Sequence, residues 1–421
     1  MKTAPKSLRL QIGLFGRTNV GKSSFLNMVA GQDVAITSPV PGTTTDVVEK
    51  TMELLPIGPV VFLDTAGLDD TSVLSDLRIK KTRKIFDRSD VIVLLTEPDR
   101  WNEYEEYVLD EARKREIPLI VAVNKIDLGL PTDAFIKKIE QKTKRIVLCS
   151  STNWKDRDAY VNPLKKHILD VCPEDFLHPP PLIGDLLPKA GLAVMIVPID
   201  KEAPKGRIIL PQVQTIRDAL DNNQAALVTN EREYKQMLKK FNCPPDIVVC
   251  DSQVVMNMVE DTPENIPCTT FSILFARYKG DLVGLAEGAA MLKALKPGDR
   301  VLIAESCSHH PIEDDIGRTK IPRWLKQFVG GDVKIDVCSG RDYPDNLKSY
   351  KLIIHCGGCM ITRREMLYRI ERAREEKIPI TNYGIAVSVL QGVIERTLSP
   401  FPQALAAFNA SQPGLERGKK E

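Results

Sequence analysis

The chain has 421 residues, of which 43% are hydrophobic and 27% charged, and its formal net charge is +2. A chain of this length accommodates two or three domains, and its composition is typical of a globular rather than a disordered protein. The nearly neutral charge argues against a nucleic-acid or membrane-surface protein that is basic throughout.

We expect a cytoplasmic protein without membrane contact. No window approaches the eighteen or so apolar residues of a transmembrane helix, and the first residues lack the apolar core and cleavage site of a signal peptide. Nine cysteines, five of them scattered singly, do not form a disulfide framework. In a reducing compartment, clustered cysteines are metal or redox sites instead.

The first predicted element is a strand at 9–15, which runs into Gly16 to Ser23 (GRTNVGKS) and then a helix over 24–29. The pattern G-x-x-x-x-G-K-S between a strand and a helix predicts a phosphate-binding loop. Lys22 is expected to reach the β- and γ-phosphates and Ser23 to hold Mg²⁺, while the helix N-terminus adds positive potential. The residues expected to line the nucleotide here are Gly16, Asn19, Val20, Gly21, Lys22, Ser23 and Ser24.

Two motifs for Mg²⁺ and the γ-phosphate follow. The segment at 41–46 (PGTTTD) lies in a polar stretch where a switch threonine would contact Mg²⁺. A predicted strand at 60–63 ends in Asp64-Thr65-Ala66-Gly67, where Asp64 would hold Mg²⁺ through water and the Gly67 N–H would meet the γ-phosphate.

Two motifs for the base complete the set. The strand predicted at 119–123 ends in Asn124, Lys125, Ile126 and Asp127. A carboxylate there accepts two hydrogen bonds from guanine N1–H and N2–H₂, a donor pair that adenine lacks. A strand at 146–148 leads to Ser150 and Ser151, whose backbone would cradle the base. Five motifs in this order predict a GTPase that uses GTP and Mg²⁺.

This part of the chain resembles the TrmE–Era family of GTPases through GRTNVGKS, PGTTTD, DTAG and NKID. Alignment to the family assigns Thr44 to Mg²⁺, with Thr45 in place of the usual arginine, and the fifth motif reads Ser-Ser for Ser-Ala. Leu68 stands where Ras-type enzymes carry the water-orienting glutamine. The resemblance therefore implies slow intrinsic hydrolysis, and it implies a K⁺ site at Asn19.

Cys172-Pro173 and the proline run at 179–181 mark a domain boundary, so we expect a GTPase domain at 1–172 and a small α/β domain at 173–270. Strands are predicted at 192–197, 225–229 and 247–250, and helices at 211–222, 231–241 and 252–260. The basic loop 201–207 reads as solvated surface. With no catalytic motif and a sheet edge able to pair with its twin, this part is predicted to dimerise, making the protein a homodimer.

A third α/β domain is predicted at 271–400, followed by a flexible tail at 401–421. Its strands are expected at 300–305, 333–337, 351–354 and 379–381, and its helices at 281–295, 324–329 and 362–376, the last capped by Thr362. Short apolar runs of this kind read as buried parallel strands. Their carboxyl ends would meet at one edge, where open α/β sheets bind ligands.

Two cysteine turns would meet at that edge. Cys307-Ser308-His309 follows the strand at 300–305, and His355-Cys356-Gly357-Gly358-Cys359 follows the strand at 351–354. Thiolates suit zinc or an iron–sulfur cluster, but each usually takes four ligands. The candidates for the fourth ligand are His309, His355, Glu313 and Asp314, with Cys338 as a rival. A structural zinc and a reduced cysteine pair remain alternatives.

The whole chain resembles the iron–iron hydrogenase maturation GTPase family, HydF, in having a GTPase, a small α/β domain and a C-x-H…H-C-x-x-C domain in this order. The resemblance implies a scaffold that holds a 4Fe–4S cluster on Cys307, Cys356 and Cys359. It also implies partners: two radical-SAM maturases that supply a di-iron precursor, and the apo iron–iron hydrogenase that receives it.

The alternative is a GTPase that acts on tRNA or in ribosome assembly, with a zinc-bearing C-terminal domain. Near-zero net charge and 6% aromatic residues argue against this alternative, because no basic stripe for nucleic acid is evident. Iron and sulfide analysis would separate the two hypotheses.

Overall fold

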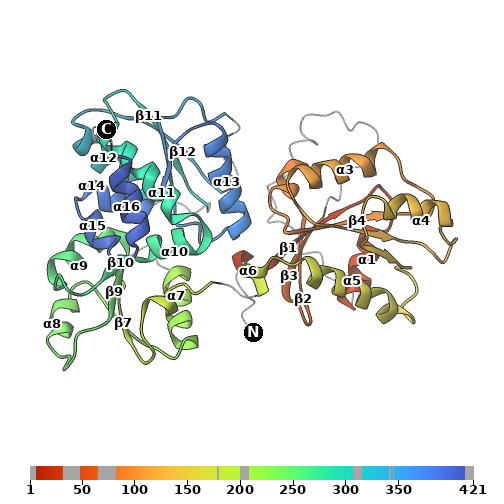
Figure 1. Ribbon diagram of the computed structural model, residues 1–421, viewed down its shortest axis with the longest axis horizontal. Helices are drawn as coiled ribbons and strands as arrows, with labels where there is room; N and C mark the ends of the chain where they lie inside the picture. The colour runs from red at the N-terminus through yellow and green to blue at the C-terminus, as the bar shows by residue number, and fades with distance from the viewer. Residues whose placement is uncertain are drawn as a thin grey trace, which may run out of the picture. The chain divides into compact units, whose positions relative to one another are not determined.

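The computed structural model divides into two compact units, Met1–Pro179 and Pro180–Glu421. Both are α/β, as the sequence predicts (Figure 1). The residues that the structure describes are 6–31, 48–64, 82–177, 180–199, 208–306, 315–340, 343–344 and 346–412.

The first unit is built on one six-stranded sheet. Its strands are β1 (Leu10–Phe15), β2 (Val48–Leu54), β3 (Gly58–Asp64), β4 (Val91–Thr96), β5 (Leu119–Val123) and β6 (Ile146–Leu148). They lie in the order β2-β3-β1-β4-β5-β6, with only β2 antiparallel to its neighbour among these strands. β1, β4 and β5 are buried along their whole length, which explains why their sequences are apolar except for Gln11 in β1 and Thr96 at the end of β4.

Helices cover both faces of this sheet. The helices of the first unit are α1 (Lys22–Ala30), α3 (Glu103–Lys114), α4 (Asp133–Glu140), α5 (Arg157–Val171) and the short α6 (Glu174–Leu177). α1 and α5 share one apolar core with the sheet, and α3 and α4 share the other (Figure 1). The loops at the carboxyl ends of the parallel strands are thereby held on a rigid three-layer frame.

The second unit contains two four-stranded parallel sheets. The first has the order β10-β9-β7-β8, from β7 (Leu192–Ile196), β8 (Ala225–Thr229), β9 (Ile247–Cys250) and β10 (Cys268–Thr270). The second has the order β12-β11-β13-β14, from β11 (Arg300–Ala304), β12 (Lys334–Cys338), β13 (Leu352–His355) and β14 (Ile380–Asn382).

The helices of this unit connect the strands and pack on both sheets. They are α7 (Leu210–Asp221), α8 (Tyr234–Leu238), α9 (Val255–Asp261), α10 (Phe271–Lys279), α11 (Leu282–Ala289), α12 (Ile321–Val329), α13 (Arg363–Glu375), α14 (Tyr383–Leu390), α15 (Ile394–Thr397) and α16 (Pro402–Ala410). Thr362 caps α13, as predicted: its Oγ1 accepts a hydrogen bond from Glu365 N at 3.2 Å.

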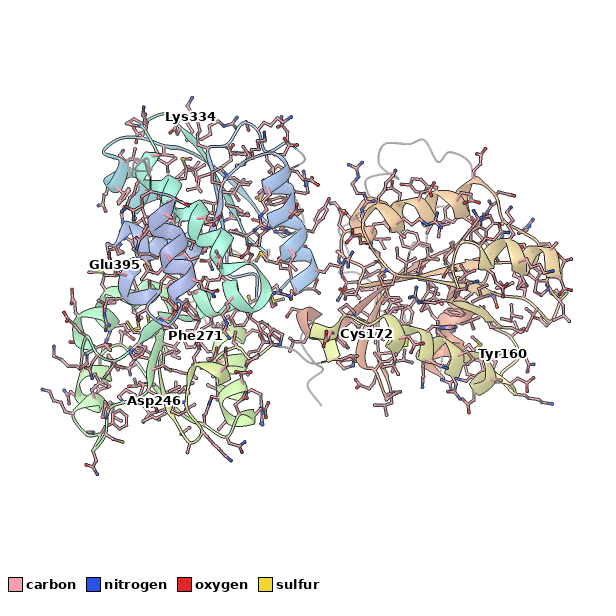
Figure 2. All side chains as sticks on the ribbon, in the orientation of Figure 1. Tyr160, Cys172, Asp246, Phe271, Lys334 and Glu395 are labelled. Atoms are coloured by element: carbon pink, nitrogen blue, oxygen red, sulfur yellow. The ribbon has the colours of Figure 1, made fainter. Side chains whose placement is uncertain are left out.

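The carboxyl ends of the two sheets face each other inside the second unit. Asp246, just before β9, and Lys334, the first residue of β12, lie at opposite ends of the unit, with Phe271 between them (Figure 2). At the meeting point, Nδ2 of Asn382 at the end of β14 donates to the Ser272 carbonyl at 2.7 Å. Loops that follow strands of both sheets are therefore brought together.

One apolar core runs through this unit, from Leu182 to Phe408. The boundary expected between 270 and 271 falls inside that core, where β10 passes directly into α10. Phe271, Leu274 and Phe275 of α10 are all buried. The segment at which a new domain was expected to start is thus a helix shared by both sheets.

Part of the segment expected to be a flexible tail, 401–421, is helical. Residues 402–410 form α16, which packs on α11 and buries Ala404 and Phe408. An alanine-rich segment with few large apolar residues gives a weak helical pattern, and proline at its first turn marks the helix start. Residues 413–421 lie outside the described part of the chain.

Among the helices of the described residues, none has the length and apolar content needed to cross a membrane.

The contact between α11 and β14 gives a first testable prediction. A Cβ on Gly288 would overlap the backbone of Ile380, lying 2.7 Å from its carbonyl carbon. Gly288→Ala should therefore lower the free energy of unfolding of this unit by about 1–3 kcal/mol, the usual range for overpacking. Chemical denaturation measures the change.

Gly284→Ala, on the same helix, is the matched control. Its Cβ would meet only the side-chain ends of Asp281 and Arg374, which can move aside. Because alanine favours helix over glycine by up to about 1 kcal/mol, this variant should be neutral or stabilised. Equal unfolding midpoints for the two variants would contradict the close packing of α11 on β14.

Candidate functional site

The glycine-rich loop lies at the carboxyl end of β1 and leads into α1. Gly21 has φ 96°, a conformation that favours glycine, and a Cβ there would lie 2.5 Å from Nδ2 of Asn124. Ser23 and Ser24 are exposed in the first turn of α1. The loop therefore presents backbone N–H groups and a helix N-terminus to solvent, as a phosphate site requires.

Lys22 lies across this loop. Its side chain is buried, and its Nζ donates to the carbonyl oxygens of Gly16 at 2.7 Å and Arg17 at 2.9 Å. The ammonium group is held inside the loop, where the sequence motif expects it to meet phosphate oxygens.

A brace from α3, which the sequence analysis missed, fixes the same loop. Arg17 forms two hydrogen bonds with the Glu105 carboxylate, at 2.8 and 2.9 Å, and Glu105 is only 1% exposed. Gly16 N donates to Tyr104 Oη at 3.2 Å. A paired, bidentate contact of this kind is strong and directional, so it sets the loop geometry. The sequence feature that could have drawn attention to Glu105 is the Asn102–Glu105 capping box at the start of α3.

Asn124 connects three of the predicted motifs. Its Nδ2 donates to the Val20 carbonyl at 2.8 Å, and its Oδ1 accepts from Ser151 N at 3.0 Å and Ser151 Oγ at 2.7 Å. The side chain is buried. Asn124 therefore ties the phosphate loop to the segment around the base, and its amide is used entirely for that purpose.

Lys125 and Asp127, the other polar residues of the base motif, are less buried than Asn124. Lys125 has φ 65° and forms an ion pair with Glu97. Burial opposes ionisation of Glu97, but its bonds with Lys125 and Arg100 hold the pKa of Glu97 below its usual value. Asp127 is exposed, with Oδ2 3.5 Å from Thr152 Oγ1, which also lies 3.1 Å from Ser150 Oγ. The carboxylate is thus accessible to a base.

Asp64 is buried at the end of β3, in register with Leu14 of β1, beside the start of the phosphate loop. The structure thus brings the described candidates from β1, β3, β5 and β6 to one sheet edge. Thr44 and Gly67 lie outside the described residues.

The Cys356–Cys359 turn follows β13 in the second unit. Cys356 N donates to the Ala304 carbonyl at 2.8 Å, and Ser306 N donates to Cys356 Sγ at 3.1 Å. Cys356 Sγ also lies 3.2 Å from Ser306 Oγ. The thiol of Cys356 is therefore next to the residue that precedes Cys307.

The turn is tight and partly buried. Gly358 has φ 66°, and a Cβ there would lie 2.5 Å from Cε of Met366. Burial, reinforced by Cys356, raises the pKa of the Cys359 thiol to about 11. A metal ion would reverse this effect, since it binds the thiolate and releases the proton.

His355 is fully buried, and both of its ring nitrogens have partners. Nδ1 bonds the Cys356 carbonyl at 2.7 Å, and Nε2 lies 3.0 Å from Nη1 of Arg369. Burial and the neighbouring Arg369 lower the pKa of His355 to about 3, so the ring is neutral. His355 would have to give up one of these bonds to bind a metal.

Lys279 is a second residue that the sequence analysis missed. It is 1% exposed, and its Nζ donates to the carbonyl oxygens of Gly358, Cys359 and Ile361 at 3.1, 3.2 and 2.7 Å. Burial lowers the pKa of Lys279 to about 8, opposed by the nearby Cys359 and Cys356.

Cys338 is the last residue of β12 and pairs in register with Ala304 of β11. On the other side of β11, His355 of β13 pairs with the same Ala304. Burial raises the pKa of the Cys338 thiol to about 11. The predicted meeting of the four strand ends at one edge is confirmed. Within the described residues no group of three or more metal-binding side chains occurs, and Cys307, His309, Glu313 and Asp314 lie outside them.

Family comparisons divide the chain into three matched segments. Residues 11–125 match the 50S ribosome-binding GTPase family. Residues 182–280 match the hydrogen maturase F dimerization domain, and residues 283–400 match the hydrogen maturase F tetramerization domain.

Similar curated proteins are named GTPases. MnmE of Prochlorococcus marinus (strain NATL1A), a tRNA modification GTPase, is 35% identical over 162 residues, which cover 37% of this chain and 34% of MnmE. The chain thus spans about a third of that relative. GTPase Era of Caldanaerobacter subterraneus subsp. tengcongensis is 30% identical over 261 residues, covering 55% of this chain and 83% of Era.

Among solved structures, a single-residue variant of Aquifex aeolicus Era bound to GDP.AlF4- is 19% identical and covers 86% of this chain and 97% of that one. Its TM-score of 0.32 is too low to support any argument. The three matched segments, in the order expected from the motifs, settle the family. The chain is a GTPase that belongs to the hydrogen maturase F (HydF) family, and its amino-terminal domain is of the TrmE/Era type.

Proposed function

We propose that this GTPase is a scaffold in the maturation of iron–iron hydrogenase that holds a 4Fe–4S cluster on Cys307, Cys356 and Cys359. The observation that carries the proposal is the position of Cys356: its thiol bonds Ser306, the residue before Cys307. Ser306, which directly precedes the Cys307 turn, and Cys356 thus lie together at one sheet edge, and this supports a site shared by the two turns.

The donor set fits such a cluster. Thiolates suit iron–sulfur clusters, and glycine at 357 keeps side-chain atoms away from this part of the turn. The Ser306 N–H already points at Cys356 Sγ, a contact that stabilises a thiolate. When bound, the cluster would supply an iron site to which a cargo can attach.

The fourth ligand is best sought among His309, Glu313, Asp314 and solvent. His355 is engaged through both nitrogens, so it serves better as a support for the Cys356 backbone than as a ligand. Three protein thiolates with an exchangeable fourth position suit a carrier, because the cargo must leave again.

The family membership supports the partners proposed here. They are a di-iron precursor as cargo, two radical-SAM maturases that supply it and the apo iron–iron hydrogenase that accepts it. Dimerization and tetramerization domains indicate an oligomer, and we propose a homodimer as its basic assembly.

In the GTPase domain we propose that Lys22, Ser23, Thr44, Asp64 and Gly67 act on the phosphates and Mg²⁺, with Asp127 reading guanine. GTP would bias the switch segments and thereby partner contacts. Asn19 would contribute to a K⁺ site beside the phosphates, a role supported by its exposed position in the loop at φ 62°.

A second candidate function is tRNA modification or ribosome assembly, which the names of the GTPase relatives suggest. The hydrogen maturase F segments at 182–400 and the net charge of +2 weigh against that alternative.

Asp127→Asn should weaken GTP binding by roughly 10²–10⁴-fold, because two hydrogen bonds to a charged carboxylate contribute about 1.5–3 kcal/mol each. Titration calorimetry measures the change. Xanthosine triphosphate, with a carbonyl oxygen where guanine has its amino group, is the control and should bind the variant better than GTP. Unchanged GTP affinity would remove Asp127 from the base site.

K⁺ should accelerate GTP hydrolysis several-fold over Na⁺ at equal ionic strength, since a positive charge beside the phosphates stabilises the charge that develops there. Asn19→Gly should abolish the difference, because glycine accepts the positive φ but offers no side-chain oxygen. Phosphate-release assays in the two salts measure it. Equal rates of hydrolysis by the wild type in the two salts would rule out the K⁺ site.

Cys356→Ser and Cys359→Ser should each lose most of the iron bound after anaerobic reconstitution, because a hydroxyl replaces a thiolate ligand poorly. Iron and sulfide content per chain is the measurement. Cys243→Ser, at an exposed cysteine of the same unit, is the control and should retain the metal. Zinc in place of iron in the wild-type protein would overturn the cluster in favour of a structural site.

A further inference from the structure

The ammonium group of Lys279 is bonded as a cation against the cysteine turn. A lysine ammonium has three N–H donors and no acceptor, and the carbonyls of Gly358, Cys359 and Ile361 satisfy all three. A neutral amine would turn its lone pair toward one of these carbonyl oxygens. The geometry therefore fits the charged form.

This buried cation has no carboxylate partner among the residues that the structure describes. A charge withdrawn from water is costly unless an opposite charge compensates it. Glu365, on the helix that follows the cysteine turn, is bonded to Arg369 at 3.1 Å instead. A metal cluster bound by thiolates at the turn would supply the compensating negative charge.

The other end of α10 also contacts the cysteine region. Ser272 Oγ accepts hydrogen bonds from Gly384 N at 3.1 Å and Asn382 Nδ2 at 3.2 Å. A Cβ on Gly357 would lie 3.6 Å from the same oxygen. α10 therefore runs along the turn, with Ser272 near Gly357 and Lys279 at Cys359.

We propose that Lys279 is a positioning residue for the cluster, which fixes the Cys356–Cys359 turn through three carbonyls and sets one positive charge beside it. The inference rests on the cluster binding proposed above. Net charge and nearby dipoles set the reduction potential of iron–sulfur clusters. Because reduction adds negative charge, a fixed cation favours the reduced state and raises the potential.

Two variants separate the roles of the lysine. Lys279→Met keeps the apolar stem but removes the charge and all three hydrogen bonds. Lys279→Gln removes the charge but retains an N–H₂ group that can bond part of the turn. Lys293→Met is the matched control. Lys293 lies over the aromatic ring of Phe408, but its Nζ bonds Gln412 and not the cysteine turn.

The experiment uses the full chain, reconstituted anaerobically with iron and sulfide. Both Lys279 variants should shift the midpoint potential, followed by electron paramagnetic resonance, to more negative values than the wild type and Lys293→Met. In the metal-free protein, hydrogen exchange of the amides at 356–361 should be several-fold faster in Lys279→Met and intermediate in Lys279→Gln.

The two proposals fail in different ways. A wild-type chain without iron overturns the cluster, whatever the variants do. An iron-loaded wild type whose potential and amide exchange are unchanged by both Lys279 variants overturns the role of Lys279 alone. If Lys279→Met does not fold, the midpoint potential of Lys279→Gln tests the electrostatic role. A midpoint potential equal to that of the wild type would reject that role.

Discussion

The structure depends on one constraint: parallel strands end at a common edge, and the residues that follow them must meet there. In the first unit this brings the phosphate loop, Asp64 and the base motif to one edge of a six-stranded sheet. In the second unit it brings Ser306, Cys338 and the Cys356–Cys359 turn to one edge of a four-stranded sheet. Segments far apart in sequence thereby become neighbours.

The order of the strands does not by itself fix the conformation of the loops that follow them. At both sheet edges a buried polar side chain holds such a loop by hydrogen bonds to its backbone. Asn124 holds the Val20 carbonyl and the Ser151 amide, and Lys279 holds three carbonyls of the cysteine turn. Each restricts the conformations of a glycine-containing turn, so that the reactive groups are preorganised before a ligand arrives.

Local patterns in the sequence predicted several strands correctly. β5, β6, β8 and β9 match the expected strands residue for residue, because short apolar runs between polar turns leave little freedom. It did not predict the Arg17–Glu105 brace or the role of Lys279, since a charged residue in a helix is expected at the surface until its partners are known. α10 was missed for a related reason: it is buried by both sheets, so its pattern lacks the one-sided apolar stripe of a surface helix.

The position of Lys279 bears on how the domains of this family divide the work. The matched dimerization segment ends at 280, immediately after Lys279, whereas the cysteine turn belongs to the segment at 283–400. Three hydrogen bonds therefore cross the boundary between the two segments at the cysteines themselves. Since both sheets also share one core, a shift of α10 cannot leave the cysteine turn unchanged. The proposed cluster site is thus composite, with thiols from one segment and its buried cation from the other.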